Sequence, residues 1–121
     1  MAKSVVVSED DPDIVALITD VLELEGYEVL GTMGAETPDV VRLSHPDVLV
    51  LDYQMPGMDG LQIARRIRSD PSTRDVPIIL MTAAGRVEKL CGQMEANGCL
   101  GKPFDIAQLI DAVENLTHSS H

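Results

Sequence analysis

The stretch PDVLVLD, residues 46–52, decides the fold class of this chain. Its central residues, 48–51, are all Val or Leu, so neither face of an extended strand would be polar. Such a run is typical of a central parallel strand that is covered on both faces. A second apolar run at residues 76–82 has the same character. Because parallel strands need long crossover connections, we expect helices between them.

Strand-like and helix-like segments alternate along the rest of the chain. The predicted strands lie near residues 5–7, 27–30, 47–52, 76–82 and 99–101. The predicted helices follow them near residues 12–25, 35–44, 61–67 and 86–97 and from residue 105 onward. With right-handed crossovers, this alternation predicts an α/β fold, a doubly wound five-stranded parallel sheet with helices on both faces. Periodicity does not determine the order of the strands.

The first predicted helix has both a start signal and an apolar stripe. Asp11 is suited to the N-cap and Pro12 to the first helical position. Apolar residues then recur at the spacing of one buried stripe, namely Ile14, Leu17, Ile18, Val21 and Leu22. The last helix carries a similar stripe, for which we expect burial of Ile106, Leu109, Ile110 and Val113.

Length and composition point to one domain with an aliphatic core. The 121 residues predict a single domain over 1–117 and a polar C-terminal tail over 118–121. The chain has one Phe, two Tyr and no Trp, so its 45% apolar share is almost entirely aliphatic. Nine basic residues against twenty acidic ones give a net charge of -11. We therefore expect no direct binding of nucleic acid or of an anionic membrane.

The state of the two cysteines, Cys91 and Cys99, follows from the expected compartment. The chain starts without an apolar leader, and no apolar run approaches the ~18 residues that a membrane span needs. We therefore expect a cytoplasmic protein in which both thiols are reduced.

Chemically capable side chains stand where the predicted strands end. Glu9 and Asp10 follow the first strand and Asp52 ends the third. Thr82 ends the fourth strand and Lys102 the fifth. Taken singly each has an ordinary interpretation, such as a surface charge or a β-branched strand residue. Because ligands bind at the carboxyl ends of parallel strands, their joint placement indicates one functional edge.

Three carboxylates at one edge repel each other unless a cation shares the site. Mg²⁺ prefers oxygen ligands and commonly takes carboxylates together with phosphate oxygens. A carboxylate can also attack phosphorus to form an acyl phosphate. Phosphoryl transfer needs neutralisation of charge, which Mg²⁺ and Lys102 would supply, and a donor such as the Thr82 hydroxyl to hold the phosphoryl oxygens.

Four motifs with these residues resemble one known family. They are VSEDDPD at 7–13, DVLVLDYQMPGMDG at 47–60, ILMTA at 79–83 and GKPF at 101–104. Together they are similar to the receiver domain of bacterial response regulators, the phosphoprotein switches of two-component and phosphorelay signal transduction. The likeness extends from Val5 to about Leu116. It implies a flavodoxin-like sheet with the strand order 2-1-3-4-5.

The resemblance implies a role for each residue of the metal and phosphoryl site. Asp52 would be the phosphoacceptor and a Mg²⁺ ligand. Asp10 would bind Mg²⁺ directly, Glu9 would act through water, and the backbone carbonyl of Gln54 would complete the protein ligands. The protein would catalyse only its own phosphorylation and dephosphorylation, and is in that sense not an enzyme.

The resemblance also implies how the switch works. Thr82 would move onto the phosphoryl group and Lys102 would pair with it, with the Lys102–Pro103 bond cis. The phosphodonor would be a phosphohistidine on a sensor histidine kinase or on a histidine phosphotransfer protein. The signal would then control an output protein that the sequence does not identify.

One position departs from the family pattern. Three residues before the lysine, most members carry an aromatic residue that rotates inward, whereas this chain has Cys99. A thiol cannot fill the volume of a ring. We therefore expect the signal to leave through movement of the helix that begins near Arg86 and of the loop before it.

Two other functions compete with the switch. A receiver-like protein-binding module that no longer switches is favoured by Cys99, but the complete acidic and basic set argues against it. A Mg²⁺-dependent phosphatase with Asp52 as nucleophile would need a second acid nearby and a cap, whereas Gln54 stands at the nearby position and the chain has no length for a cap.

Overall fold

Five parallel strands form one sheet in the order β2-β1-β3-β4-β5. This is the order that the resemblance implied. The computed structural model describes residues 2–54 and 59–118 of the chain. The strand bounds are Ser4–Ser8 for β1, Glu28–Thr32 for β2, Val48–Asp52 for β3, Ile78–Ala83 for β4 and Gly98–Lys102 for β5.

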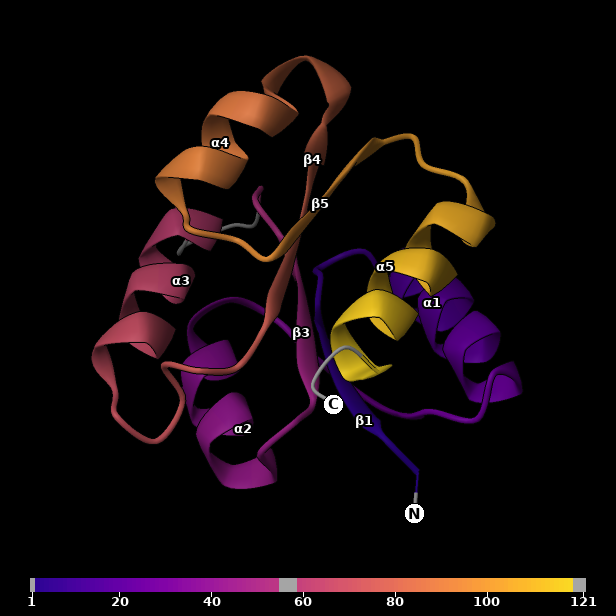
Figure 1. The fold of residues 1–121 in the computed structure, drawn as a ribbon, viewed down its shortest axis with the longest axis horizontal. Helices are drawn as coiled ribbons and strands as arrows, with labels where there is room; N and C mark the ends of the chain where they lie inside the picture. Colours follow the sequence, from indigo (N-terminus) through magenta and orange to yellow (C-terminus); the bar gives the residue numbers. More distant parts are fainter. Residues whose placement is uncertain (1, 55–58, 119–121) are drawn as a thin grey trace.

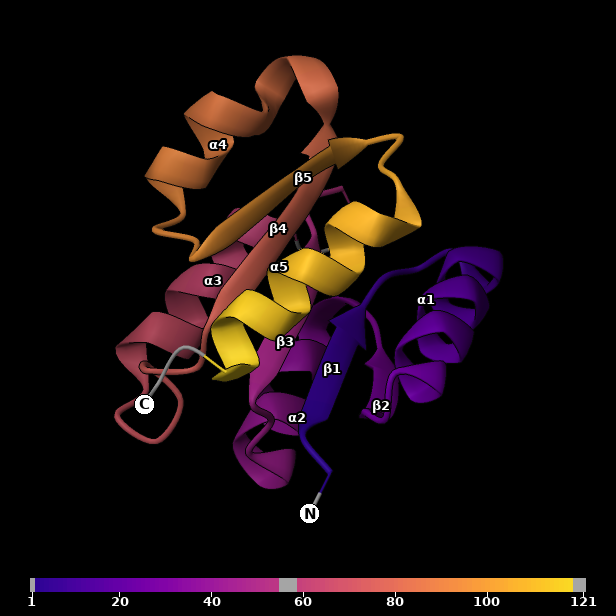
Figure 2. The ribbon, with the colours of Figure 1, turned by 45° about the vertical axis from the view of Figure 1, so that its right-hand side comes forward.

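Helices connect the strands and cover both faces of the sheet (Figure 1). They are α1 (Pro12–Leu24), α2 (Thr37–Ser44), α3 (Gly60–Ser69), α4 (Val87–Gln93) and α5 (Ile106–His118). Short 3₁₀ turns, η1 (Gly34–Glu36) and η2 (Ala84–Arg86), precede α2 and α4. Helices α1 and α5 lie together on one side, and α2, α3 and α4 lie on the other; Figure 2 shows the sheet between these two layers. The predicted doubly wound α/β fold is confirmed.

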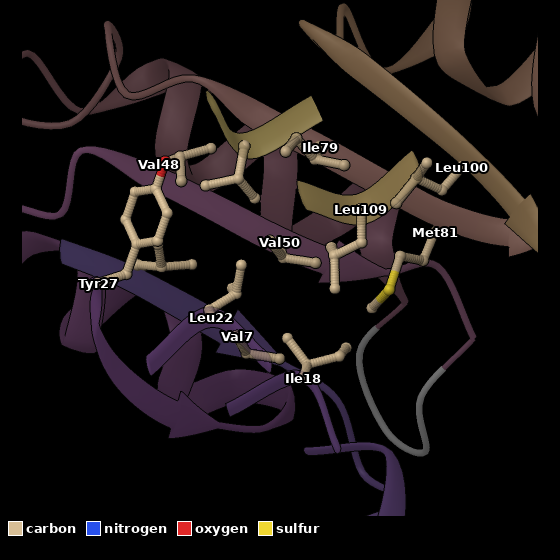
Figure 3. Packing of buried hydrophobic residues seen from close by; sticks show 12 residues of the cluster. Val7, Ile18, Leu22, Tyr27, Val48, Val50, Ile79, Met81, Leu100 and Leu109 are labelled. Carbon is tan, nitrogen blue, oxygen red and sulfur yellow. The ribbon is translucent and has the colours of Figure 1, made fainter. Parts of the chain in front are cut away.

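The aliphatic core is divided in two by the sheet. Because successive strand residues point to opposite faces, each strand contributes to both halves. The half under α1 and α5 includes Val7, Val50 and Met81, and Figure 3 shows these residues gathered with Ile18 and Leu22 of α1 and Leu109 of α5. The other half, under α2–α4, is built on Val6, Leu49, Leu51, Ile78 and Leu80. Every residue of β3 is buried, as its unbroken Val/Leu run predicted.

Some of the sequence-based detail is wrong. Leu17 and Ile106, which were expected in buried stripes, are 50% and 45% exposed. Each lies at the margin of its helix face, where periodicity alone does not say how wide a stripe the sheet covers. The helix expected over residues 86–97 is shorter, because α4 ends at Gln93 and Glu95 has a left-handed backbone with φ of 51°. The segment 35–44 is divided between η1 and α2.

The prediction of two reduced thiols is also wrong for this structure. Cys91 of α4 and Cys99 of β5 form a disulfide, with their Cα atoms 6.2 Å apart. The expected cytoplasmic compartment bears only on the redox state of the surroundings. It carried no information on which cysteines the fold brings together.

The ends of the chain bear on two further expectations. Helix α5 continues to His118, and residues 119–121 of the predicted polar tail lie outside the described residues. The domain limits of 1–117 and 118–121 stay a prediction. Among the helices of the described ranges, none combines the length and apolar character needed to cross a membrane.

Helix α3 begins directly beside the end of β3. The Asp59 carboxylate accepts the N–H of Gln62 at 3.0 Å, and the Gln62 side-chain oxygen accepts the N–H of Asp59 at 3.1 Å. This capping box satisfies N–H groups at the helix start. The next residue, Gly60, donates its N–H to the Tyr53 carbonyl at 2.8 Å. A Cβ on Gly60 would lie 2.8 Å from the Tyr53 Cα and 3.2 Å from the Asp52 carbonyl oxygen, so glycine is required there.

We predict opposite effects for two Gly→Ala substitutions. Gly60→Ala should lower the free energy of unfolding by about 1–3 kcal/mol, because the backbone around Asp52 must shift to admit a methyl group. Gly92→Ala should raise it by about 0.5–1 kcal/mol, because Gly92 lies within α4 with open space at its Cβ position. Urea denaturation of both variants measures the difference, and a stable Gly60→Ala protein would contradict the close approach.

Candidate functional site

The predicted site residues meet at the carboxyl edge of the sheet. Glu9 and Asp10 follow β1, and Asp52 is the last residue of β3. Carboxylate oxygens of these three residues lie within 4.8 Å of one another. Glu9 and Asp52 are buried, with relative exposures of 2% and 4%, and Asp10 is half-buried. The tertiary structure thus assembles the acidic cluster that the strand ends predicted.

Lys102 links two of these carboxylates. Its Nζ lies 3.1 Å from Oε2 of Glu9 and 3.2 Å from Oδ1 of Asp52. The lysine is the last residue of β5, with two strands between it and β1. It therefore reaches across the edge of the sheet and neutralises charge on two buried carboxylates. The Lys102–Pro103 peptide bond that follows is cis, as the resemblance implied.

The electrostatics of the cluster follow from burial and mutual repulsion. Burial, together with the negative charge of Asp52, raises the pKa of Glu9 to about 7, although hydrogen bonds from Lys102 and Asp11 act against this. Burial lowers the pKa of Lys102, but the negative charges of Asp52 and Glu9 outweigh it and the net pKa is raised. The ammonium therefore stays charged, and the Glu9 carboxyl gains or loses its proton near neutral pH.

Backbone N–H groups from two loops, one after β1 and one after β3, lie near the carboxylates. The N–H of Gln54 lies 3.4 Å from Oδ1 of Asp52, and the N–H of Asp11 donates to Oε1 of Glu9 at 3.2 Å. The Asp11 contact was not anticipated, although an acid two residues before an N-cap is a recognisable local pattern. The expected role of the Gln54 carbonyl as a metal ligand stays a prediction. Residues 55–58 of the phosphoacceptor motif lie outside the described residues.

Thr82 has an unusual environment for a hydroxyl. It is 2% exposed, and its Oγ1 has no hydrogen-bond partner within the described ranges. Thr82 follows Met81, the register partner of Asp52, and is itself paired with Gly101, the residue before Lys102. A buried hydroxyl without a partner is energetically costly. This one stands at the edge where the acidic cluster and Lys102 meet.

These residues fit a divalent metal and a phosphoryl group. Clustered carboxylate oxygens are the donors that Mg²⁺ prefers. A phosphoryl group would supply acceptor oxygens for the Thr82 hydroxyl and for the Lys102 ammonium. Two mismatches decide the fit: surplus negative charge at Glu9, Asp10 and Asp52, and a buried Thr82 hydroxyl without a hydrogen-bond partner among the described residues.

One contact near the edge was missing from the sequence-based expectations. The guanidinium carbon of Arg86 in η2 lies 5.3 Å from the ring centroid of Tyr53, which follows Asp52. The segment after β4 is therefore attached to the segment after β3 by a cation–π contact. No sequence signal pairs these two residues, because the contact depends on how two loops meet.

The fold and this site together define a family. The pattern of the response regulator receiver domain matches residues 5–114, and the chain belongs to that family. Receiver domains are signalling switches of two-component systems, not enzymes that turn over external substrates.

Known relatives agree along nearly the whole chain. The polar-differentiation response regulator DivK of Brucella ovis is 31% identical over 95% of this chain and 96% of its own length. A solved structure of a candidate response regulator from Chloroflexus aurantiacus superposes with a TM-score of 0.89 at 30% identity, covering 98% of this chain and 99% of that one. The receiver domain of the sensor histidine kinase PA1611 of Pseudomonas aeruginosa, with a coordinated magnesium ion, has a TM-score of 0.84 at 28% identity, with coverage of 98% and 99%.

The raised pKa of Glu9 predicts a pH effect on the metal-free protein. Between pH 4.5 and about 7 the unfolded chain ionises Glu9 while the folded chain keeps it protonated. The folded state then binds more protons, so this group makes the free energy of unfolding fall as pH rises through that window, and it adds no slope above it. Glu9→Gln should remove this part of the pH dependence.

The measurement is urea denaturation at pH 5 and pH 7.5 in the presence of a chelator. Glu23→Gln, on the exposed face of α1, is the matched control and should retain the wild-type slope. Equal slopes for Glu9→Gln and wild type would show that Glu9 does not carry the effect.

Proposed function

We propose that this receiver domain is a Mg²⁺-dependent phosphoacceptor switch whose acceptor is the Asp52 carboxylate. The observation that carries the proposal is the ion pair between the buried Asp52 and the half-buried Lys102. Two further carboxylates lie next to it, and so does the Thr82 hydroxyl, which has no hydrogen-bond partner among the described residues. An ordinary salt bridge needs neither a cluster of like charges nor an orphaned donor. A site that alternately holds a carboxylate and an acyl phosphate accounts for both features, because the clustered acids hold the cation and the Thr82 hydroxyl binds a phosphoryl oxygen.

The chemistry at Asp52 is a direct transfer. A carboxylate oxygen of Asp52 attacks the phosphorus of a phosphohistidine, a new P–O bond forms and the P–N bond breaks. The leaving imidazole nitrogen keeps the bonding electron pair and takes up a proton. Lys102 is already 3.2 Å from Asp52 and can move its ammonium onto a phosphoryl oxygen. The Thr82 hydroxyl then donates to another phosphoryl oxygen.

Mg²⁺ would be held by Asp10 and Asp52, with Glu9 acting through water and the Gln54 carbonyl as a further ligand. When bound it supplies positive charge beside the carboxylates and the phosphoryl oxygens. The magnesium-bound structure of the PA1611 receiver domain supports this assignment by similarity. Burial is the main cause of the raised pKa of Glu9, and the charge of Asp52 adds to it; a bound cation would offset the second of these causes.

The partners follow from the chemistry of the family. We propose that the donor is a sensor histidine kinase or a histidine phosphotransfer protein, and that an output protein reads the phosphorylated state. The readout would come from η2 and α4, because Thr82 lies two residues before η2 and Cys99 replaces the ring that most members carry. Movement of Thr82 toward the phosphoryl group would pull on the segment that starts at Ala83.

A protein-binding module that does not switch is the second candidate. Cys99 and its disulfide to α4 favour it, because they replace a mobile ring with a covalent link. Partner binding that is equally tight for wild type and for Asp52→Asn would support this candidate over the switch.

The decisive experiment is phosphorylation by acetyl phosphate with and without Mg²⁺. We expect the intact mass to rise by one phosphoryl group only when Mg²⁺ is present, and Asp52→Asn to abolish the increase. Thr82→Ala should still be phosphorylated at Asp52 but should lose the phosphorylation-dependent change in amide hydrogen exchange across η2 and α4.

Asp75→Asn is the matched control, because Asp75 is an exposed acid just before β4, at the opposite edge of the sheet. It should be phosphorylated like wild type. Absence of any mass increase in the wild-type protein, or a mass increase that persists in Asp52→Asn, would overturn the assignment.

A further inference from the structure

The disulfide joins helix α4 to strand β5. Helix α4 is the element that we expect to move when Asp52 is phosphorylated. Cys91 lies in the second half of α4, and Cys99 lies in β5, which is an edge strand of the sheet. Their Cα atoms are 6.2 Å apart, within the ~4.4–6.8 Å range in which a disulfide forms without backbone movement. Both cysteines are half-buried, so part of the surface of each residue is exposed to solvent.

Two periodicities bring the cysteines together. Leu100 faces the core half under α1 and α5, so its neighbour Cys99 points to the opposite face, where α4 lies. On α4, the buried residue Leu90 and the buried Met94 at its C-cap define the face toward the sheet, and Cys91 lies beside them. The pairing therefore arises from the same strand alternation and helix spacing that build the core.

The link spans a turn that is itself firmly anchored. The N–H of Asn97 donates to the Ile78 carbonyl at 2.8 Å, and the N–H of Ile78 donates to the Asn97 side-chain oxygen at 2.9 Å. Arg68 donates to the same oxygen at 2.9 Å. The segment after α4 is thus fixed to β4 by hydrogen bonds, whereas α4 itself buries few side chains. The disulfide adds a covalent restraint to the second half of α4. The hydrogen bonds between Asn97 and Ile78 fix the segment after α4 to β4, but not α4 itself.

We propose that Cys91 and Cys99 form a reversible thiol–disulfide exchange site that sets how far α4 can move from β5. The chemical partner is a small-molecule disulfide such as oxidised glutathione, with its thiol as the reductant. Oxidised, the pair holds α4 against β5; reduced, it releases α4. The consequence for signalling rests on the proposed function, because α4 is the element expected to report phosphorylation of Asp52.

The exchange balances without any further reagent. One cysteine thiolate attacks a sulfur of the small disulfide, forming a mixed disulfide and releasing one small thiolate. The second cysteine then attacks the protein sulfur of that mixed disulfide, closing the Cys91–Cys99 bond and releasing the second small thiolate. The two protons of the cysteine thiols end on the released thiols, the two cysteines are oxidised and the small disulfide is reduced.

The first test is a redox titration of the folded protein in glutathione buffers, quenched with a maleimide and read by intact mass. We expect the wild-type protein to interconvert between a form that takes up two maleimides and a form that takes up none. Cys91→Ser and Cys99→Ser should each stop at one glutathione adduct. A disulfide that reduces only after unfolding, or mixed adducts that accumulate in wild type, would overturn the proposal.

The second test is amide hydrogen exchange over residues 84–94 in the two redox forms, before and after treatment with acetyl phosphate and Mg²⁺. Exchange should be faster in the reduced form, and the double variant Cys91→Ser/Cys99→Ser should match the reduced form in either buffer. The exchange difference caused by phosphorylation should be larger in the reduced form. Identical exchange in the two redox forms would contradict the restraint on α4.

Failure of the proposed function gives a different result. If neither redox form gains a phosphoryl group at Asp52, the phosphoacceptor assignment is wrong. The redox titration and the exchange of the unphosphorylated protein still decide whether the cysteine pair restrains α4. If both forms are phosphorylated to the same extent but α4 responds equally in each, the exchange site does not control the switch.

Discussion

The ammonium of Lys102 holds together two carboxylates from different strands that would otherwise repel each other. Glu9 and Asp52 are almost completely buried, and a third acid, the half-buried Asp10, lies beside them. Burial of Glu9, together with repulsion from Asp52, raises the pKa of Glu9. One lysine cannot balance three acids, so the edge of the sheet keeps an affinity for further positive charge.

The rest of the fold serves to deliver these groups to one edge. Parallel pairing places the carboxyl ends of all strands on the same side, and a core built from both faces of β3 keeps Asp52 in register with Met81, next to Thr82. Gly60 lets α3 start in close contact with the backbone of Asp52 and Tyr53. Helix α4, which we propose as the element that reports phosphorylation, is short and buries few side chains, so we expect it to be less stable than the sheet that carries the acids.

Much of this organisation was predictable from local sequence. The unbroken run at 48–51 indicated a covered parallel strand, and the acids, hydroxyl and lysine after successive strands indicated a shared edge. The margins were less predictable: Leu17 and Ile106 fit a helical stripe but lie outside the covered area, because the curvature and extent of the sheet decide how wide that stripe is. The early end of α4 was missed because apolar spacing continues through Met94 while the backbone has already turned.

The sequence by itself determined the fold class, the aliphatic core and which polar residues stand at the carboxyl ends of the strands. These follow from periodicity and from where each run of apolar residues stops, which are local properties. Only the tertiary structure decided that Lys102 bridges Glu9 and Asp52, that Arg86 meets Tyr53 and that Cys91 joins Cys99. Each of these contacts links different elements of the fold, and no pattern along the chain encodes the distance between two side chains that meet only after the sheet has formed.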